Sequence, residues 1–132
     1  MKGKFITTDE VERDQLEWGE IGWLSRPSTT ETEAITVMEV RLDPGKCHAF
    51  HRHPGQEEVI YVMSGEVEQW LEKEKQILRT GDSIYIGEGV VHACFNDSDQ
   101  PVRFIVILGP CAGDDGYIVE ELADQAPWNS LR

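Results

Sequence analysis

The sequence of 132 residues predicts an all-β fold, a β-sandwich or a jelly roll, from three observations. Val and Ile together number 21 against eight Leu, and β-branched residues favour strands. Several short segments alternate apolar and polar residues with the period of two that is typical of half-buried strands. Gly, Pro and Asp turns separate these segments at intervals of roughly ten residues, which is typical of sandwiches and jelly rolls.

The first elements along the chain are weakly marked. Residues 8–11 (TDEV) are expected to open a short helical turn, capped by the threonine or the aspartate. Residues 21–24 (IGWL) predict a short strand that ends before Pro27. The polar residues 28–33 predict a loop.

Clear alternation begins in residues 35–42, where the even positions from 38 onwards are apolar and the odd positions between them are charged. This pattern predicts a strand with one face in water, followed by a turn at residues 43–45 (DPG). Residues 59–63 (VIYVM) are apolar at every position, so we expect that strand to be covered on both faces.

The second half of the chain continues the pattern. Segments 66–71 and 76–79 flank the charged residues 72–75, which predicts a hairpin. Further strands between turn residues are predicted at 83–86, 92–96 and 102–108. The tail from residue 114 is acidic, and residues 117–122 fit either an edge strand or a short helical turn.

Charge and composition exclude several classes of partner. Twelve basic and 25 acidic side chains leave a net charge of −13, which repels the phosphates of nucleic acids and anionic membranes. No apolar run approaches the ~20 residues of a membrane helix, and residues 1–15 lack a signal-peptide pattern, so we expect a cytoplasmic protein. Three cysteines without regular spacing predict neither a disulfide framework nor a structural zinc knot.

The histidines are the strongest indication of chemistry. Two of the four lie in His51-Arg52-His53, and side chains at i and i+2 of a strand point to the same side. Glu57 and Glu58 follow after a turn that can fold a carboxylate back, and His92 lies in a later predicted strand. Three imidazoles and one carboxylate form a ligand set typical of a divalent transition metal with positions open to water or substrate.

The spacing of these residues resembles the first of two motifs of the cupin superfamily. Gly45 is followed after five residues by His51-Arg52-His53, after four more by Glu58, and after six more by Gly65. The six-residue gap selects Glu58 over Glu57. Alternation along the strand also puts these two carboxylates on opposite faces.

The second cupin motif is matched after a gap of 15 residues, which is similar to the compact bacterial single-domain cupins. Gly81 is followed after five residues by Gly87-Glu88-Gly89, after two more by His92, and after three more by Asn96. The family usually has Pro at the position of Gly87. The glycine makes the same turn with more freedom and leaves the ligand assignment unchanged.

The resemblance implies a double-stranded β-helix, the jelly-roll barrel of cupins, over about residues 35–110 of one domain that spans residues 1–132. It also implies a bound divalent transition metal, with manganese, iron, nickel, copper and zinc not distinguished. The implied ligands are His51, His53, Glu58 and His92.

Cupins that resemble this chain include dioxygenases, decarboxylases, isomerases and sugar or small-molecule binders. The resemblance alone does not select one of these functions. Our first hypothesis is a metal-dependent enzyme acting on a small organic acid or carbonyl compound, with no general base that the sequence identifies. The alternatives are a non-catalytic small-molecule or sugar-binding sensor and a purely structural dimer module. Cupins of this size usually pair, so we expect a homodimer.

Three further residues lie close to the motifs. Cys94 shares the strand parity of His92 and either fills the core or lines the cavity. His48 has the opposite parity to His51, so we expect it at a surface or an interface. Gln56, in the turn between predicted ligands, either reaches a bound ligand or faces solvent.

Overall fold

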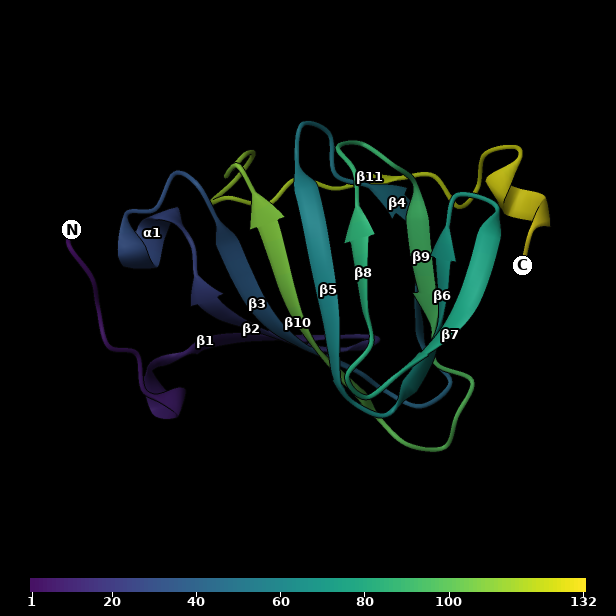
Figure 1. Cartoon of the computed structure of the whole chain (residues 1–132), viewed down its shortest axis with the longest axis horizontal. Helices are drawn as coiled ribbons and strands as arrows, with labels where there is room; N and C mark the ends of the chain where they lie inside the picture. The colour runs from purple at the N-terminus through teal and green to yellow at the C-terminus, as the bar shows by residue number, and fades with distance from the viewer.

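The computed structural model describes all residues, 1–132, and contains eleven strands in two antiparallel sheets (Figure 1). In spatial order, the larger sheet consists of β1 (Glu12–Leu16), β2 (Gly19–Ser25), β3 (Thr36–Leu42), β10 (Val102–Gly109), β5 (Glu57–Ser64) and β8 (Ser83–Ile86). The smaller sheet consists of β11 (Glu120–Glu121), β4 (Cys47–Arg52), β9 (His92–Phe95), β6 (Glu66–Leu71) and β7 (Glu74–Arg79). The predicted all-β class is confirmed.

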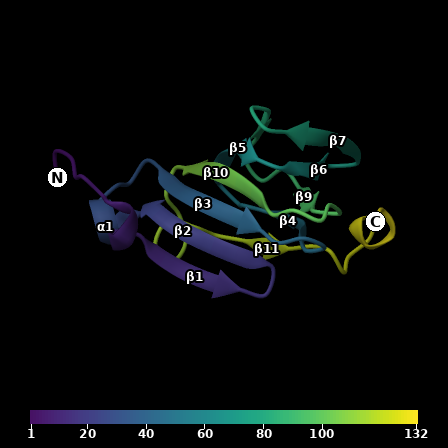
Figure 2. The ribbon, with the colours of Figure 1, turned by 90° about the horizontal axis from the view of Figure 1, so that it is seen from below.

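Short helical turns lie at the two ends of the molecule. The 3-10 turn η1 (Thr8–Glu10) and the helix α1 (Pro27–Thr30) lie at the N-terminal end, and the 3-10 turn η2 (Trp128–Ser130) lies at the opposite end (Figure 1). Seen from below, β1, β2 and β3 lie side by side on one side, and the β6–β7 hairpin lies on the other (Figure 2). None of the helices, of which α1 is the longest at four residues, could cross a membrane.

The main core lies between the inner faces of the two sheets. At the centre of the larger sheet, β10 pairs with β3 on one side and with β5 on the other, and its residues alternate between buried and more exposed. Met38, Leu42, Val62 and Leu108 are among the thirteen buried apolar residues of this core. The interior that surrounds the site is therefore largely apolar.

A second apolar cluster lies on the outer face of the smaller sheet, and the C-terminal segment covers it. Phe50 and Trp70 form the sheet side of the cluster, with ring centroids 5.4 Å apart. Leu122 and Trp128 pack on them from the tail, the Trp128 ring 5.5 Å from that of Phe50. The short strand β11, which pairs with β4, settles the open prediction for residues 117–122 in favour of an edge strand.

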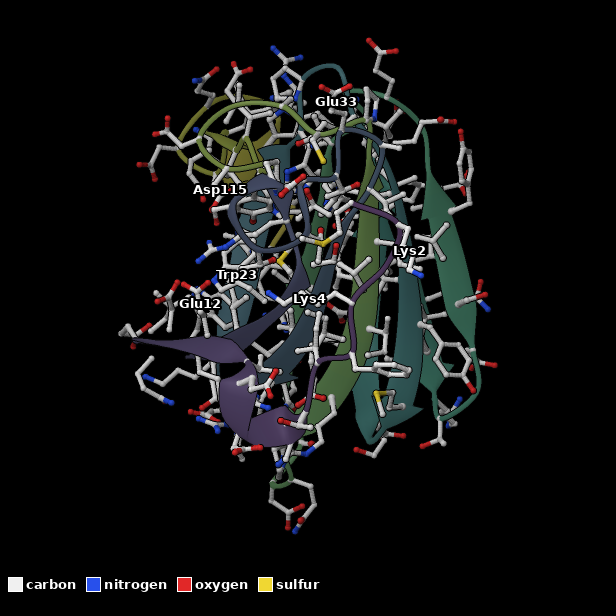
Figure 3. All side chains as sticks on the ribbon, turned by 90° about the vertical axis from the view of Figure 1, so that its left-hand side faces the viewer. Lys2, Lys4, Glu12, Trp23, Glu33 and Asp115 are labelled. Atoms are coloured by element: carbon white, nitrogen blue, oxygen red, sulfur yellow. The ribbon has the colours of Figure 1, made fainter.

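The segment before β11 is tied back to the N-terminal part of the chain. The backbone N–H of Ser28 donates to Asp115 Oδ1 at 2.7 Å, and Arg26 Nε lies 3.1 Å from Asp115 Oδ2. Asp115 and Trp23 lie on the same side of the molecule (Figure 3), where the Arg26 guanidinium stacks over the Trp23 ring. These contacts hold residues 110–118 across the end of the barrel that contains the histidines.

Some sequence-based predictions are wrong. The strand at residues 59–63 is covered on one face only, because Val59, Tyr61 and Met63 are 38–45% exposed and no other part of the chain lies over them. Strand β1 was not expected, since all of its residues are exposed and no burial pattern marks it. Within the polar stretch predicted as a loop, residues 28–30 belong to α1.

Asn96 joins the second motif to the end of β3 and to the loop before β10 through four hydrogen bonds. Its Nδ2 donates to the carbonyls of Leu42 and Gln100, and its Oδ1 accepts from the backbone N–H and hydroxyl of Ser98. The side chain is fully buried. Asn96→Ala is expected to lower the free energy of unfolding by about 2–3 kcal/mol, because the four hydrogen bonds of this buried side chain are lost.

Urea denaturation measures this change, with Asn129→Ala at an exposed position as the control. The control should change stability by less than about 0.5 kcal/mol. Equal effects of the two substitutions would contradict the importance of the Asn96 network.

Candidate metal centre

The four predicted ligands lie between the two sheets, at one end of the barrel. His51 in β4 pairs directly with His92 at the start of β9, both in the smaller sheet. His53 follows β4, and Glu58 enters from β5 of the larger sheet. All four side chains are buried, with 2–5% exposure. The structure thus brings together residues that are up to 41 positions apart in the sequence.

The side chains converge closely. One nitrogen from each of His51, His53 and His92 lies within 4.8 Å of the others. Glu58 Oε1 lies 2.8 Å from His92 Nε2, and Glu58 Oε2 lies 3.6 Å from His53 Nε2. This arrangement agrees with the predicted choice of Glu58, while Glu57 points outward and accepts a hydrogen bond from the Tyr85 hydroxyl.

Backbone carbonyls determine which nitrogen of each imidazole carries a proton. Nδ1 of His51 lies 2.7 Å from the carbonyl of Ala49, and Nδ1 of His92 lies 3.0 Å from that of Val90. Nδ1 of His53 lies 2.7 Å from the carbonyl of Ile118. A carbonyl only accepts, so each Nδ1 is the donor, and in the neutral ring Nε2 keeps its lone pair. Three acceptor nitrogens therefore face one another.

This arrangement fits a cation. Glu58 Oε1 and His92 Nε2 are buried and have no hydrogen-bond partner, although they lie only 2.8 Å apart. Two acceptors at that distance repel each other unless positive charge lies between or beside them. A divalent cation would satisfy both atoms and the other two Nε2 atoms at once, and carbonyl-bound Nδ1–H groups are the usual outer partners of metal-binding histidines.

The pKa shifts of the four side chains arise from their burial and from the contact between Glu58 and His92. Burial lowers the pKa of His53 and lowers that of His51 well below its usual value, so both rings are neutral at neutral pH. Burial opposes charge on Glu58 and His92 too, but their mutual contact outweighs it. The pKa of Glu58 is lowered and that of His92 is raised. The ionised carboxylate thus attracts positive charge to this point.

A cavity of about 50 Å³ adjoins the four residues, enough for a few water-sized groups. Ten of its sixteen lining residues are hydrophobic, and no Lys or Arg lines it. Beyond the four predicted ligands, the lining residues with polar groups are Trp18, His48, Gln69, Cys94 and Tyr117. Positive charge in this cavity would therefore come from a protonated histidine or from a bound metal.

A β-bulge in β4 overturns the parity argument for His48. His48 pairs with Cys94 and His51 pairs with His92, so three steps along β4 match two along β9. The extra residue turns His48 to the same side as His51, and their rings stack with centroids 3.6 Å apart. His48 therefore lines the cavity, and its Nε2 lies 3.3 Å from Glu121 Oε1.

Gln56 neither faces solvent nor reaches into the cavity. It is 1% exposed, and its Nε2 donates to the carbonyls of Pro110 and Gly116. Its Oε1 accepts from the N–H of Ile118, the residue whose carbonyl holds His53. Gln56 thus positions the tail segment that completes the histidine cluster.

Sequence reasoning missed the contribution of the tail to the site. The Tyr117 ring lies 5.2 Å from that of His53 and lines the cavity. Neither Tyr117 nor the carbonyl of Ile118 belongs to a recognisable motif. The only signal was the glycine-rich stretch before them, which predicts a turn but does not indicate where the following residues pack.

Comparison with known proteins places these features in a family. The family model described as "Cupin domain" (Cupin_2) matches residues 38–108. Protein SchB of Streptomyces halstedii is 30% identical over 96% of this chain and 94% of its own length. Polyketide synthase CurC of Streptomyces cyaneus is 27% identical over 85% of this chain and 73% of its own.

Among solved structures, KdgF from Halomonas sp. superimposes with a TM-score of 0.75 at 22% identity. The match covers 86% of this chain and 98% of KdgF. At this identity the likeness concerns the fold alone.

Cys94 lines the cavity beside the cluster, and burial raises the pKa of its thiol to about 12. At pH 8 a thiol with that pKa is about one part in 10⁴ thiolate, against roughly a quarter for an ordinary cysteine. Iodoacetamide is therefore expected to alkylate Cys94 at least about 100-fold more slowly in the folded protein than in urea. Peptide mass spectrometry measures both rates, and equal rates would contradict the burial of this thiol.

Proposed function

The chain belongs to the cupin family, and from that premise we propose that it is a metal-dependent enzyme acting on a small organic acid or carbonyl compound. The observation that carries the proposal is the convergence of three Nε2 lone pairs, each freed by a carbonyl on Nδ1, with an unpartnered buried carboxylate. The proposed ligands are His51, His53, Glu58 and His92.

Manganese, iron, nickel, copper and zinc all accept imidazole and carboxylate ligands. Three neutral imidazoles and one carboxylate would leave a divalent ion with a formal charge of +1. When bound, the ion would polarise a substrate oxygen as a Lewis acid, or support oxygen chemistry if it is iron or manganese.

The chain's own residues prepare the site for such a substrate. The apolar walls formed by Met38, Ile60 and Phe104 exclude water from the space next to the cluster. Tyr117 keeps its proton at neutral pH because burial raises the pKa of its phenol. Its hydroxyl can therefore donate a hydrogen bond to an oxygen of the substrate.

The lining favours a carbonyl compound over a molecule with several charges. No Lys or Arg lines the cavity to pair with a second carboxylate. Of the relatives, CurC is named a polyketide synthase, and polyketides are compounds built around carbonyl groups. A carbonyl oxygen or a single carboxylate directed at the metal, with an apolar remainder, matches this surface.

Matched carboxylate variants test the ligand set. Glu58→Gln is expected to lower metal affinity by more than about 100-fold, because even outer partners of metal ligands contribute 10–100-fold. Glu57→Gln, one residue away but directed to solvent, should retain the affinity of the wild type. Elemental analysis after dialysis against a weak chelator gives the metal content of each.

His92→Ala is the second variant in that series, and we expect it to lose bound metal as Glu58→Gln does. Circular dichroism establishes that the variant is folded. Stoichiometric metal in folded His92→Ala protein would remove His92 from the ligand set.

A non-catalytic small-molecule or sugar-binding sensor is the second candidate. Burial raises the pKa of both Cys94 and Tyr117, so neither supplies a base near neutral pH. Turnover of a panel of small acids and carbonyl compounds, with and without added metal and oxygen, separates the two functions. An enzyme should convert at least one compound only when metal is present. Ligand binding without any conversion would favour the sensor.

We further propose a homodimer that forms through the larger sheet. Val59 and Tyr61 on β5, with Tyr85 on β8 and Ile107 on β10, form an exposed apolar patch across adjacent strands. The C-terminal segment covers the outer face of the smaller sheet, but no part of the chain covers this patch. A second copy would bury it.

Tyr61→Glu places a charge within this patch and is expected to convert dimers into monomers. Ile77→Glu, at an equally exposed position on β7 of the other sheet, is the control and should remain dimeric. Light scattering measures both masses. A monomeric wild type, or a dimeric Tyr61→Glu protein, would contradict this interface.

A further inference from the structure

Gln69 has a buried amide oxygen without a hydrogen-bond partner. The side chain lies on β6, is 3% exposed and lines both the cavity beside the histidines and a second cavity toward β7 and β8. Its Nε2 donates to the carbonyl of Trp70 at 3.2 Å, but its Oε1 has no donor. A buried acceptor without a donor is costly, which indicates that something outside the chain satisfies it.

The orientation of the amide is determined by its neighbour. Exchanging Oε1 and Nε2 would bring two oxygens together at the carbonyl of Trp70, which repel each other. The oxygen, an acceptor only, is therefore the atom left free. A ligand for it must supply an O–H or N–H group.

Gln69 lies on β6, the strand next to the one that carries His92, and is displaced along the barrel wall from the proposed metal site. It pairs with Cys94 on β9, and Cys94 is two residues from His92 on the same face. Two residues along a strand span about 7 Å. A ligand that binds the metal through one oxygen can therefore reach Gln69 with a second polar group two or three carbon atoms away.

Gln56 provides the contrast. It is equally buried, but its amide makes three hydrogen bonds to the tail, and none of its polar atoms is left free. The chain thus satisfies one interior glutamine completely and leaves the other with an unpaired acceptor.

We propose that Gln69 is a specificity-determining residue whose Oε1 accepts a hydrogen bond from a hydroxyl group of the metal-bound substrate. The substrate class is accordingly a hydroxy-substituted acid or carbonyl compound with an apolar remainder. This inference rests on the proposed metal-dependent function and adds a second anchor at the opposite end of the substrate.

Thermal stability without ligand gives the first test. Gln69→Leu removes an unsatisfied polar group, so its melting temperature should equal or exceed that of the wild type. Gln56→Leu, the matched control, breaks three satisfied hydrogen bonds and should melt well below the wild type. Gln69→Met, with an unbranched side chain, is the second variant in case leucine does not pack. If both Gln69 variants melt below the wild type, Gln69 is structural and the inference is overturned.

Ligand binding gives the second test. Calorimetry on cobalt-loaded protein compares 3-hydroxypropionate with propionate, which lacks the hydroxyl group. The wild type should prefer the hydroxy acid by about five- to tenfold, the value of one net hydrogen bond. Gln69→Leu and Gln69→Met should lose this preference while binding propionate within about twofold of the wild type.

The outcomes separate this inference from the metal proposal. If cobalt binds but the preference is absent, or survives in both Gln69 variants, the inference fails and the metal site stands. If the preference persists in metal-free His92→Ala protein, the contact lies elsewhere and the inference also fails. If the wild type binds no cobalt, the metal proposal fails first, and the inference falls with it.

Discussion

The hydrogen bonds from histidine Nδ1 to backbone carbonyls are the constraint on which the site depends. Each carbonyl comes from a different place: the bulge in β4, the loop before β9 and the C-terminal tail. Each hydrogen bond occupies the Nδ1 of one ring and directs its Nε2 toward the centre of the cluster. With Glu58 opposite, four side chains direct their electron pairs to one point, where His92 Nε2 and Glu58 Oε1 lie 2.8 Å apart. Within an apolar interior this arrangement needs positive charge, either a proton on His92 or a bound cation.

The tail is therefore part of the site rather than an appendage to the barrel. Gln56 binds the segment on both sides of Tyr117, and Asp115 ties it to the N-terminal end. Ile118 then presents its carbonyl to His53, and Tyr117 closes the cavity wall. Beyond this segment, Leu122 and Trp128 cover the smaller sheet. One stretch of chain thus completes the ligand geometry and buries an outer apolar face, so loosening the tail would disturb the orientation of a ring as well as the stability of the fold.

The sequence indicates which side chains come together, but not the local backbone geometry that orients them. Both outcomes have physical reasons. The spacing around His51, His53, Glu58 and His92 identified residues that the fold does bring together, because side-chain identity and the period of a strand are both readable. The predicted position of His48 was wrong because one extra residue in β4 moves its side chain to the other face of the strand, and no residue type indicates that bulge. The carbonyl partners could not be predicted, since every residue has a carbonyl. The outer face of β5 was thought to be covered because apolar composition does not distinguish a core from an uncovered patch.

The acidic surface and the cavity without Lys or Arg affect substrate recognition in different ways. A net charge of −13 disfavours the approach of anions, and the cavity contains no Lys or Arg to reverse this locally. Attraction for an anionic or carbonyl oxygen would then come from the metal alone, which acts at one point and discriminates little between molecules that share that oxygen. Selectivity between substrates must then come from neutral groups further along the cavity, which distinguish molecules by their size and by the hydrogen bonds they form. Gln69 is such a group, since its buried Oε1 has no partner within the fold, and Tyr117 lines the same cavity. Under the proposed function, the chemistry and the choice of substrate would therefore reside in different parts of the same barrel.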